Sequence, residues 1–108
     1  MPKFLFEGSY TTEGVRGVMK DKASGRKAVV EKLLASLGGK LESIHFAFGK
    51  EDVFVLAELP DSVSAAALSM TIAASGALKG KTIPLLTVEE VDQALTKSVA
   101  YTRPGGET

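Results

Sequence analysis

A β-hairpin pattern in the middle of the chain, with a helical pattern on each side of it, most constrains the fold. Residues 41–48 and 53–59 are two strand-like runs, and the turn-forming residues 49–52 separate them. A short interval of this kind between two alternating runs is typical of an antiparallel hairpin. Pro60 follows the second run and ends it, because proline cannot donate a hydrogen bond to a neighbouring strand.

The hairpin register follows from where the turn closes. We expect Phe48 to lie opposite Val53, because these residues flank the turn. The same register then predicts three further pairs across the hairpin: Phe46 with Val55, His45 with Leu56, and Ser43 with Glu58.

Two main helices are predicted, one before and one after the hairpin. Apolar residues at helical spacing fill residues 29–37, after an interruption at residues 21–25 that separates a shorter helix or turn beginning near Thr11. The second helix begins at Asp61 or Ser62 and runs toward Gly76. Its apolar row is expected to be Val63, Ala66, Ala67 and Met70, with Ala65, Leu68, Ser69, Ile72 and Ser75 on the opposite side.

Strand patterns also occur at both ends of the domain. Residues 3–10 alternate and carry aromatic side chains, and residues 78–86 form a fourth run in which Pro84 indicates a sheet edge. The order is β-α-β-β-α-β, the ferredoxin-like arrangement of the α+β class with a four-stranded antiparallel sheet. A capping box at residues 87–90 starts a C-terminal helix. We expect one domain over residues 1–100 and a flexible tail over residues 101–108.

The composition excludes several classes of function. The 108 residues include 13 Lys and Arg, 13 Asp and Glu, and no Cys. Nucleic-acid binders usually carry a basic excess, and the absence of Cys excludes thiol catalysis and disulfides. No segment has the length of apolar sequence that a membrane span needs, and the N-terminus lacks a signal-peptide pattern. We therefore expect a cytoplasmic protein without nucleic-acid or membrane partners.

The two faces of the predicted sheet differ in polarity. One face is dense in apolar side chains, which predicts the helix-covered core: Phe4, Phe6, Ile44, Phe46, Phe48, Val53 and Val55. The other mixes apolar and ionisable groups: Leu5, Glu7, Ser9, Leu41, Ser43, His45, Phe54, Leu56 and Glu58. This second face is too apolar for a bare surface and too polar for a simple core. We expect it to pack against a second copy and enclose a partly polar cavity.

The second main helix supports association independently. No charged residue occurs between Asp61 and Lys79. A helix that is apolar nearly all round is normally covered on more than one side. We therefore predict a homo-oligomer, a dimer or a larger assembly.

Five segments resemble the GYD-domain proteins, which are small bacterial and archaeal proteins. They are YTTEGV, LGGKLES, FAFG, LPDSVSAAALS and TIPLLT, in this order, and the resemblance extends from Met1 to about Leu95. It implies a ferredoxin-like domain similar to the dimeric α/β-barrel group, in which two sheets pack face to face. Where the family usually has Gly-x-Tyr-Asp, this chain has Gly49, Lys50, Glu51 and Asp52. The family tyrosine is therefore replaced by Glu51, and the resemblance implies no particular reaction.

His45 is the best candidate for a general base, because its unperturbed pKa lies near neutrality. The expected register places it on one face with Glu58, which would orient the imidazole, and with Ser43. Such a group suits a cofactor-independent isomerase or monooxygenase. The alternative is a histidine whose hydrogen bonds are satisfied within a subunit interface, which is the more common situation. A Ser43–His45–Glu58 nucleophilic triad is rejected, because a flat sheet face lacks an exposed nucleophile turn and an oxyanion hole.

Three further residues are candidate ligand contacts. Glu7 and Phe54 share the second face, and Tyr10 ends the first strand, where its hydroxyl would reach a cavity mouth. Glu7, His45 and Glu58 would be a weak metal site, so no metal and no cofactor is predicted. We therefore expect a small-molecule-binding or structural module with an inter-sheet cavity for a small organic ligand. The alternative is an enzyme that uses His45 as the base.

Overall fold

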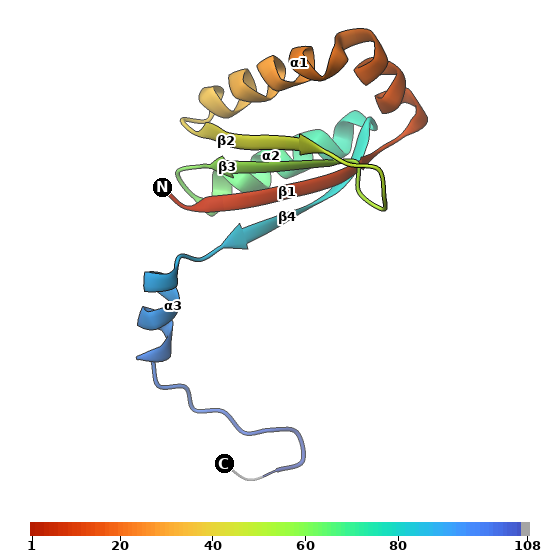
Figure 1. The fold of residues 1–108 in the computed structure, drawn as a ribbon. Helices are drawn as coiled ribbons and strands as arrows, with labels where there is room; N and C mark the ends of the chain where they lie inside the picture. The colour runs from red at the N-terminus through yellow and green to blue at the C-terminus, as the bar shows by residue number, and fades with distance from the viewer. Residues whose placement is uncertain (107–108) are drawn as a thin grey trace.

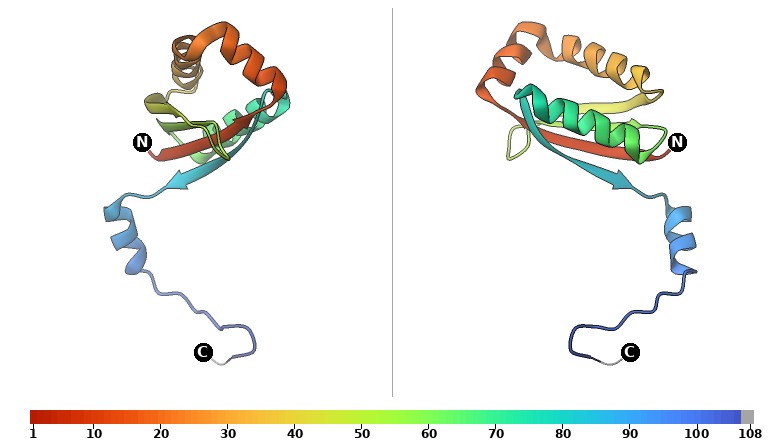
Figure 2. Two further views of the ribbon diagram at one scale, coloured as in Figure 1. Left: turned by 45° about the vertical axis from the view of Figure 1, so that its right-hand side comes forward. Right: turned by 180° about the vertical axis from the view of Figure 1, so that it is seen from behind.

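The computed structural model describes residues 1–106 and has the predicted ferredoxin-like α+β fold (Figure 1). Its elements are β1 (Lys3–Tyr10), α1 (Thr12–Ser36), β2 (Lys40–Phe46), β3 (Val53–Glu58), α2 (Ser62–Ser75), β4 (Leu78–Leu85) and α3 (Val88–Leu95). The four strands form one antiparallel sheet in the order β2-β3-β1-β4. The helices α1 and α2 cover one face of it, and the opposite face is open (Figure 2). No helix in residues 1–106 is long and apolar enough to cross a membrane.

The helix boundaries agree with the capping residues in the sequence. Thr11 caps α1, Asp61 caps α2, and Thr87 with Glu90 forms the predicted capping box of α3. The predicted interruption of the first helix is confirmed, because Lys22 breaks α1 with a φ of 63°. Residues other than glycine rarely adopt a positive φ, and this φ is not helical. The helix α1 therefore consists of two helical segments joined by a kink at Lys22.

The predicted hairpin register is wrong by two residues. Val53 lies opposite Phe46, His45 opposite Phe54, and Ser43 opposite Leu56. The reason is a wider turn, in which the amide of Ala47 donates to the carbonyl oxygen of Asp52. Phe48 therefore lies in the loop and is fully exposed, and Phe46 is 39% exposed, so neither belongs to the core as predicted.

A β-bulge between Leu41 and Ser43 corrects a second expectation. Because the bulge adds a residue to β2, Leu41 lies opposite Ala57 and packs against the core cluster. Leu41 therefore faces the helices, whereas the alternation of the sequence predicted it on the open face.

The predicted inner and outer sides of α2 are reversed. Ala65 and Leu68 are buried, and the side chains of Val63 and Met70 are 78% and 66% exposed. The small residues Ala65 and Ser69 let the helix approach the sheet closely, and the Ser69 hydroxyl hydrogen-bonds that of Thr82 on β4. Since both sides of α2 are apolar, helical periodicity alone could not distinguish them.

The core lies between α1, α2 and the end of the sheet where β1 begins. Its buried members are Phe4, Leu34, Ala57, Leu59, Ala65 and Leu68. No described polar side chain is buried in it. The first half of β1 therefore anchors both helices to the sheet.

The last part of the chain leaves this body. We define the C-terminal arm as residues 86–106, and it projects away from the sheet in both ribbon views (Figures 1 and 2). The radius of gyration is 17.3 Å, against about 13 Å for a compact domain of this length. The apolar residues of the arm are exposed: Leu86, Val88, Val91, Leu95, Val99 and Tyr101. The predicted tail lies within this arm, except for residues 107 and 108, which lie outside the described part of the chain.

Candidate ligand-binding site

Most of the sequence-predicted site residues lie on the open face of the sheet. One row across the strands runs from His45 to Phe54, then Glu7, then Lys81. The neighbouring row runs from Ser43 to Leu56, Leu5 and Ile83. The open face therefore carries a central apolar strip with ionisable groups beside it.

His45 and Glu58 do not form the expected pair. Glu58 lies opposite Lys40, and its carboxylate is 3.8 Å from the Lys40 ammonium group. His45 lies opposite Phe54, four residues from Glu58 along β3, which corresponds to about 13 Å. Within one chain, Glu58 therefore cannot orient the imidazole, and a catalytic role for His45 stays a prediction. Among the described residues, no three His, Asp or Glu side chains gather as a metal site.

Gly49 to Asp52, the segment that corresponds to the family's naming motif, holds the hairpin loop against the end of β1. The Asp52 carboxylate accepts a 2.9 Å hydrogen bond from the Tyr10 amide, and the Asp52 amide donates to the Gly8 carbonyl. The Ser9 hydroxyl donates to Glu51 over 3.2 Å and to the carbonyl of Lys50 over 2.6 Å. Asp52 and Glu51 thus act as structural residues of the loop.

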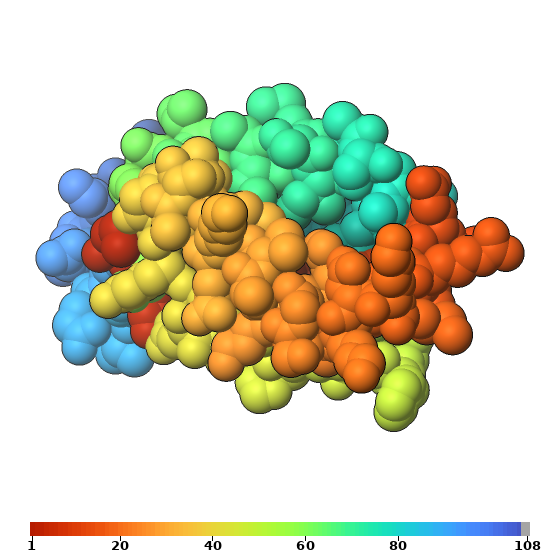
Figure 3. Space-filling view, turned by 90° about the horizontal axis from the view of Figure 1, so that it is seen from above, coloured from red at the N-terminus to blue at the C-terminus, as the bar shows by residue number. Residues whose placement is uncertain are grey.

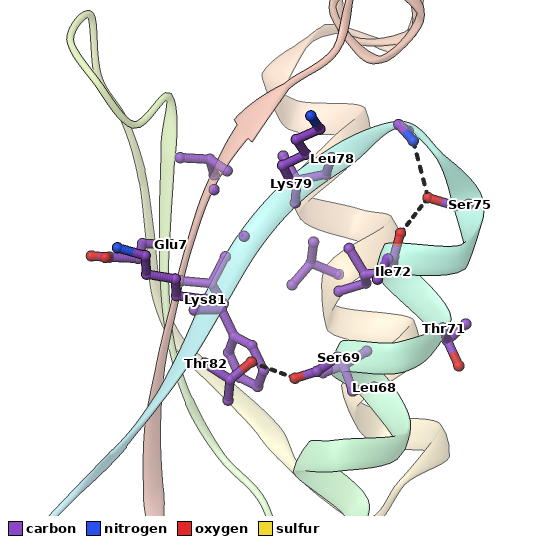
Figure 4. A pocket seen from close by; sticks show the side chains of 18 of the residues that line it. Glu7, Leu68, Ser69, Thr71, Ile72, Ser75, Leu78, Lys79, Lys81 and Thr82 are labelled. Atoms are coloured by element: carbon purple, nitrogen blue, oxygen red, sulfur yellow. Dashed lines mark hydrogen bonds between the residues drawn. The ribbon is translucent and has the colours of Figure 1, made fainter.

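Tyr10 differs from the other predicted residues, because it lies on the helix-covered face. There it contributes to a pocket between α1 and α2, which we call the interhelical pocket (Figures 3 and 4). Its volume is about 510 Å³. The pocket arises because α1 packs mainly over β2 and α2 over β4, so that the central strands β1 and β3 form a floor between them.

The walls of the interhelical pocket are mostly apolar. Their apolar side chains come from both helices and all four strands: Phe6, Val30, Leu33, Leu34, Ile44, Val53, Val55, Leu68, Ile72 and Leu78. The polar pair Ser69 and Thr82 lies on the α2 side, and the hydrogen bond that joins these hydroxyls is drawn in Figure 4. Ser69 also donates to the carbonyl of Ala65 over 2.9 Å. These hydroxyls are therefore already engaged within the protein.

The end of the pocket near the close of β1 is polar and contains a guanidinium group. Arg26, which follows the kink of α1, lines this end together with Tyr10. Burial raises the pKa of the Tyr10 phenol, and the Arg26 guanidinium partly opposes the shift. The phenol therefore stays neutral near pH 7 and retains a proton to donate. The guanidinium lies 3.6 Å from a carboxylate oxygen of Asp21, as a loose, partly exposed ion pair.

Charged residues of the strands lie around the pocket without facing it. Glu7 and Lys81 are directly paired across β1 and β4, and Figure 4 shows both side chains on the side of the sheet away from α2. Lys79 has the same parity as Lys81, because it lies opposite Ser9 of the open face. Arg26 is therefore the charged group that the described part of the chain presents to this pocket.

Sequence reasoning missed the interhelical pocket because it assigned the wrong side of α2 to the core. The available signal was the small size of three residues that border the space: Ser69, Ala73 and Ala77. Small residues over a sheet leave room that larger residues would fill. Periodicity cannot reveal whether two helices close over that room.

Comparison with known proteins identifies a family and adds no reaction. No curated protein and no solved structure matches the chain. The family model described as GYD domain matches residues 4–95, which include all strands and helices of the fold except the first residue of β1. This chain belongs to the GYD-domain family.

Proposed function

We propose that this protein binds a small, largely apolar organic molecule in the interhelical pocket. The observation that carries the proposal is the cavity of about 510 Å³ between α1 and α2. This volume falls in the range of about 300–1,000 Å³ that is typical of ligand pockets with apolar walls and few polar groups. The pocket opens to solvent between the helices, since its lining residues Thr71, Ala73 and Ser75 are exposed. A ligand that covers its apolar walls would remove apolar surface from water, which is favourable.

The test uses a neutral apolar dye and a pair of adjacent variants. Ala73 borders the pocket, and its neighbour Ala74 is exposed on the same helix without bordering it. Ala73→Trp places an indole across the opening, and Ala74→Trp adds the same group beside it. We expect the fluorescence of Nile red to rise on binding to the unaltered protein and to Ala74→Trp, and to rise at least tenfold less with Ala73→Trp.

The melting temperature of each unliganded variant is the control for folding. Equal dye binding by the two folded variants would contradict a site in the pocket. Loss of dye binding in both would place the dye elsewhere on the surface of α2.

We also propose that the protein is a homo-oligomer that assembles through the open face of the sheet, with a cytoplasmic location. Two features support association. The open face carries the half-buried apolar side chains of Leu5, Phe54 and Leu56 and the exposed Ile83 between charged ones. The C-terminal arm also has exposed apolar side chains that its own chain does not cover. A second copy would cover both surfaces. Native mass spectrometry of the purified protein tests this, and a monomer would contradict it.

A further inference from the structure

We propose that the ligand of the interhelical pocket is a small amphipathic monocarboxylate, with its apolar body between α1 and α2 and its carboxylate at Arg26. This inference rests on the proposed binding function and names the chemical class of the ligand. It follows from the asymmetry of the pocket, whose walls are mostly apolar and which has the guanidinium of Arg26 beside Tyr10 at one end.

Arg26 has free capacity for an anion. A guanidinium carries five N–H donors in a planar fork that matches a carboxylate. The contact of Arg26 with Asp21 is 3.6 Å, longer than a hydrogen bond, and the Arg26 side chain is 32% exposed. The position of Arg26 at the pocket lets the remaining donors reach a ligand. The Tyr10 hydroxyl, which is neutral near pH 7, adds a further donor at the same end.

The neighbouring carboxylates limit the charge that the ligand can carry. Asp21 lies beside Arg26, and Asp52 lies beside Tyr10, where its carboxylate accepts from the Tyr10 amide. Each carboxylate repels any anionic ligand and opposes the attraction of Arg26, so binding at this end depends on direct hydrogen bonds from the guanidinium and the phenol. A ligand with two negative charges would be repelled more strongly than a single carboxylate.

No other part of the pocket competes for the carboxylate. The hydroxyls of Ser69 and Thr82 are hydrogen-bonded to each other, and the Ser69 hydroxyl also donates to the carbonyl oxygen of Ala65. The hydroxyls of Thr71 and Ser75, which also border the pocket, donate to carbonyl oxygens of their own helix. Glu7, Lys79 and Lys81 border it from strands whose open face they share. The other lining side chains are apolar, and burial of an uncompensated charge against them is costly. The carboxylate is thus directed to Arg26, and the hydrocarbon part to the space over β1 and β3.

The test compares three ligands of equal length by isothermal titration calorimetry at pH 7.5: decanoate, decan-1-ol and decylammonium. We expect decanoate to bind at least tenfold more tightly than decan-1-ol, and decylammonium to bind most weakly. Hydrogen bonds to charged groups contribute enough for a change of tenfold or more in affinity. Arg26→Gln should lower the affinity for decanoate at least tenfold and leave that for decan-1-ol unchanged.

Two further variants serve as controls for this interpretation. Arg16→Gln removes an exposed arginine of α1 that does not border the pocket, so it should not alter binding of any of the three ligands. Arg26→Lys keeps the charge and loses the planar fork, so it should retain part of the preference for decanoate. The melting temperature of unliganded Arg26→Gln should stay close to that of the unaltered protein, since the ion pair with Asp21 is exposed.

Equal affinities for decanoate and decan-1-ol would overturn the inference, as would equal effects of Arg26→Gln and Arg16→Gln. Either result would leave the proposed function intact if Nile red still distinguishes Ala73→Trp from Ala74→Trp. Absence of binding by all three ligands and by the dye would refute both proposals. If Ala73→Trp instead dissociates the oligomer, a segment of a second copy fills the pocket, and the inference is again overturned.

Discussion

The two faces of the sheet are formed by the same strands, but their residues differ in burial. On the covered face Phe4 and Ala57 are buried beneath helices, whereas their neighbours on the open face, Leu5 and Leu56, are only half-buried. Strand alternation decides which residues share a face. What lies above the face decides whether they become core, pocket or exposed surface. Even on the covered face, the space between α1 and α2 is filled at one end and hollow at the other.

The largest expected effect comes from removing core volume on the covered face. Leu34 is fully buried in α1 and contacts the core cluster. Leu34→Ala should lower the free energy of unfolding by about 2–5 kcal/mol, because it removes buried methyl groups and leaves a cavity. Urea denaturation followed by circular dichroism measures this change.

The matched change on the open face is Leu56→Asp. If the two faces differ as the structure indicates, this variant keeps the fold and loses the proposed homo-oligomer, because a charge would enter the proposed interface between copies. Its mass in solution and its urea midpoint are both measured. A Leu56→Asp protein that unfolds as readily as Leu34→Ala would contradict the comparison, since the open face would then act as core within one chain.

The next effect concerns the contact that joins α1 to the sheet. A Cβ atom at Gly14 would collide with the carbonyl oxygen of Ala77, the residue before β4. Gly14→Ala should therefore lower the free energy of unfolding by about 1–3 kcal/mol, through displacement of backbone. Thermal unfolding measures it.

Gly17 provides the control for Gly14. It lies one turn further along α1, with nothing within 4 Å of an added Cβ. Gly17→Ala should raise the free energy of unfolding by about 0.5–1 kcal/mol, because alanine loses less backbone entropy in a helix. If both variants respond alike, the close contact at Gly14 is not what limits the approach of α1.

The smallest effect is a pH dependence at the start of α2. The amide of Ser64 donates a 2.8 Å hydrogen bond to the Asp61 carboxylate, and this bond lowers the pKa of Asp61. A pKa that is lower in the folded protein stabilises the fold fully above the unfolded value of 3.8, and this contribution is lost as the pH falls through the folded pKa. Asp61→Asn keeps the cap and should remove only this acidic dependence.

Melting temperatures between pH 2 and pH 7 measure the effect. The difference between Asp61→Asn and the unaltered protein should shrink as the pH falls below about 4. Asp61→Ala, which removes the cap altogether, should melt lower than Asp61→Asn across the range. A difference that is constant with pH would show that the charge of Asp61 plays no part.

Much of the fold could be predicted from local signals. The kink of α1, the capping box at Thr87 and the edge position of β4 with its Pro84 are confirmed. Of the two candidate caps that the sequence offers at the start of each main helical segment, Thr11 and Asp61 are the ones used. Each depends on the chemistry of a few neighbouring residues, such as a side chain that accepts a hydrogen bond from a free amide. The family resemblance is also confirmed by the match over residues 4–95.

The candidate site was less accessible to prediction. The row that joins His45, Phe54 and Glu7 depends on a register that the wider hairpin turn moved by two residues. That shift took Glu58 away from His45 and gave it Lys40 as a partner. Residue alternation is the same for the two registers, so the sequence predicted the correct face for these residues and the wrong neighbours.

The sequence by itself determined the order of strands and helices, the helix ends and most of the residues on each face of the sheet. Only the tertiary structure decided which side of α2 is buried, how far apart α1 and α2 lie, and that Arg26 and Tyr10 meet at one end of the pocket between them. The physical reason is the distance along the chain over which each effect acts. Capping and alternation act between residues close in the chain, whereas a cavity exists only where surfaces from distant segments fail to meet.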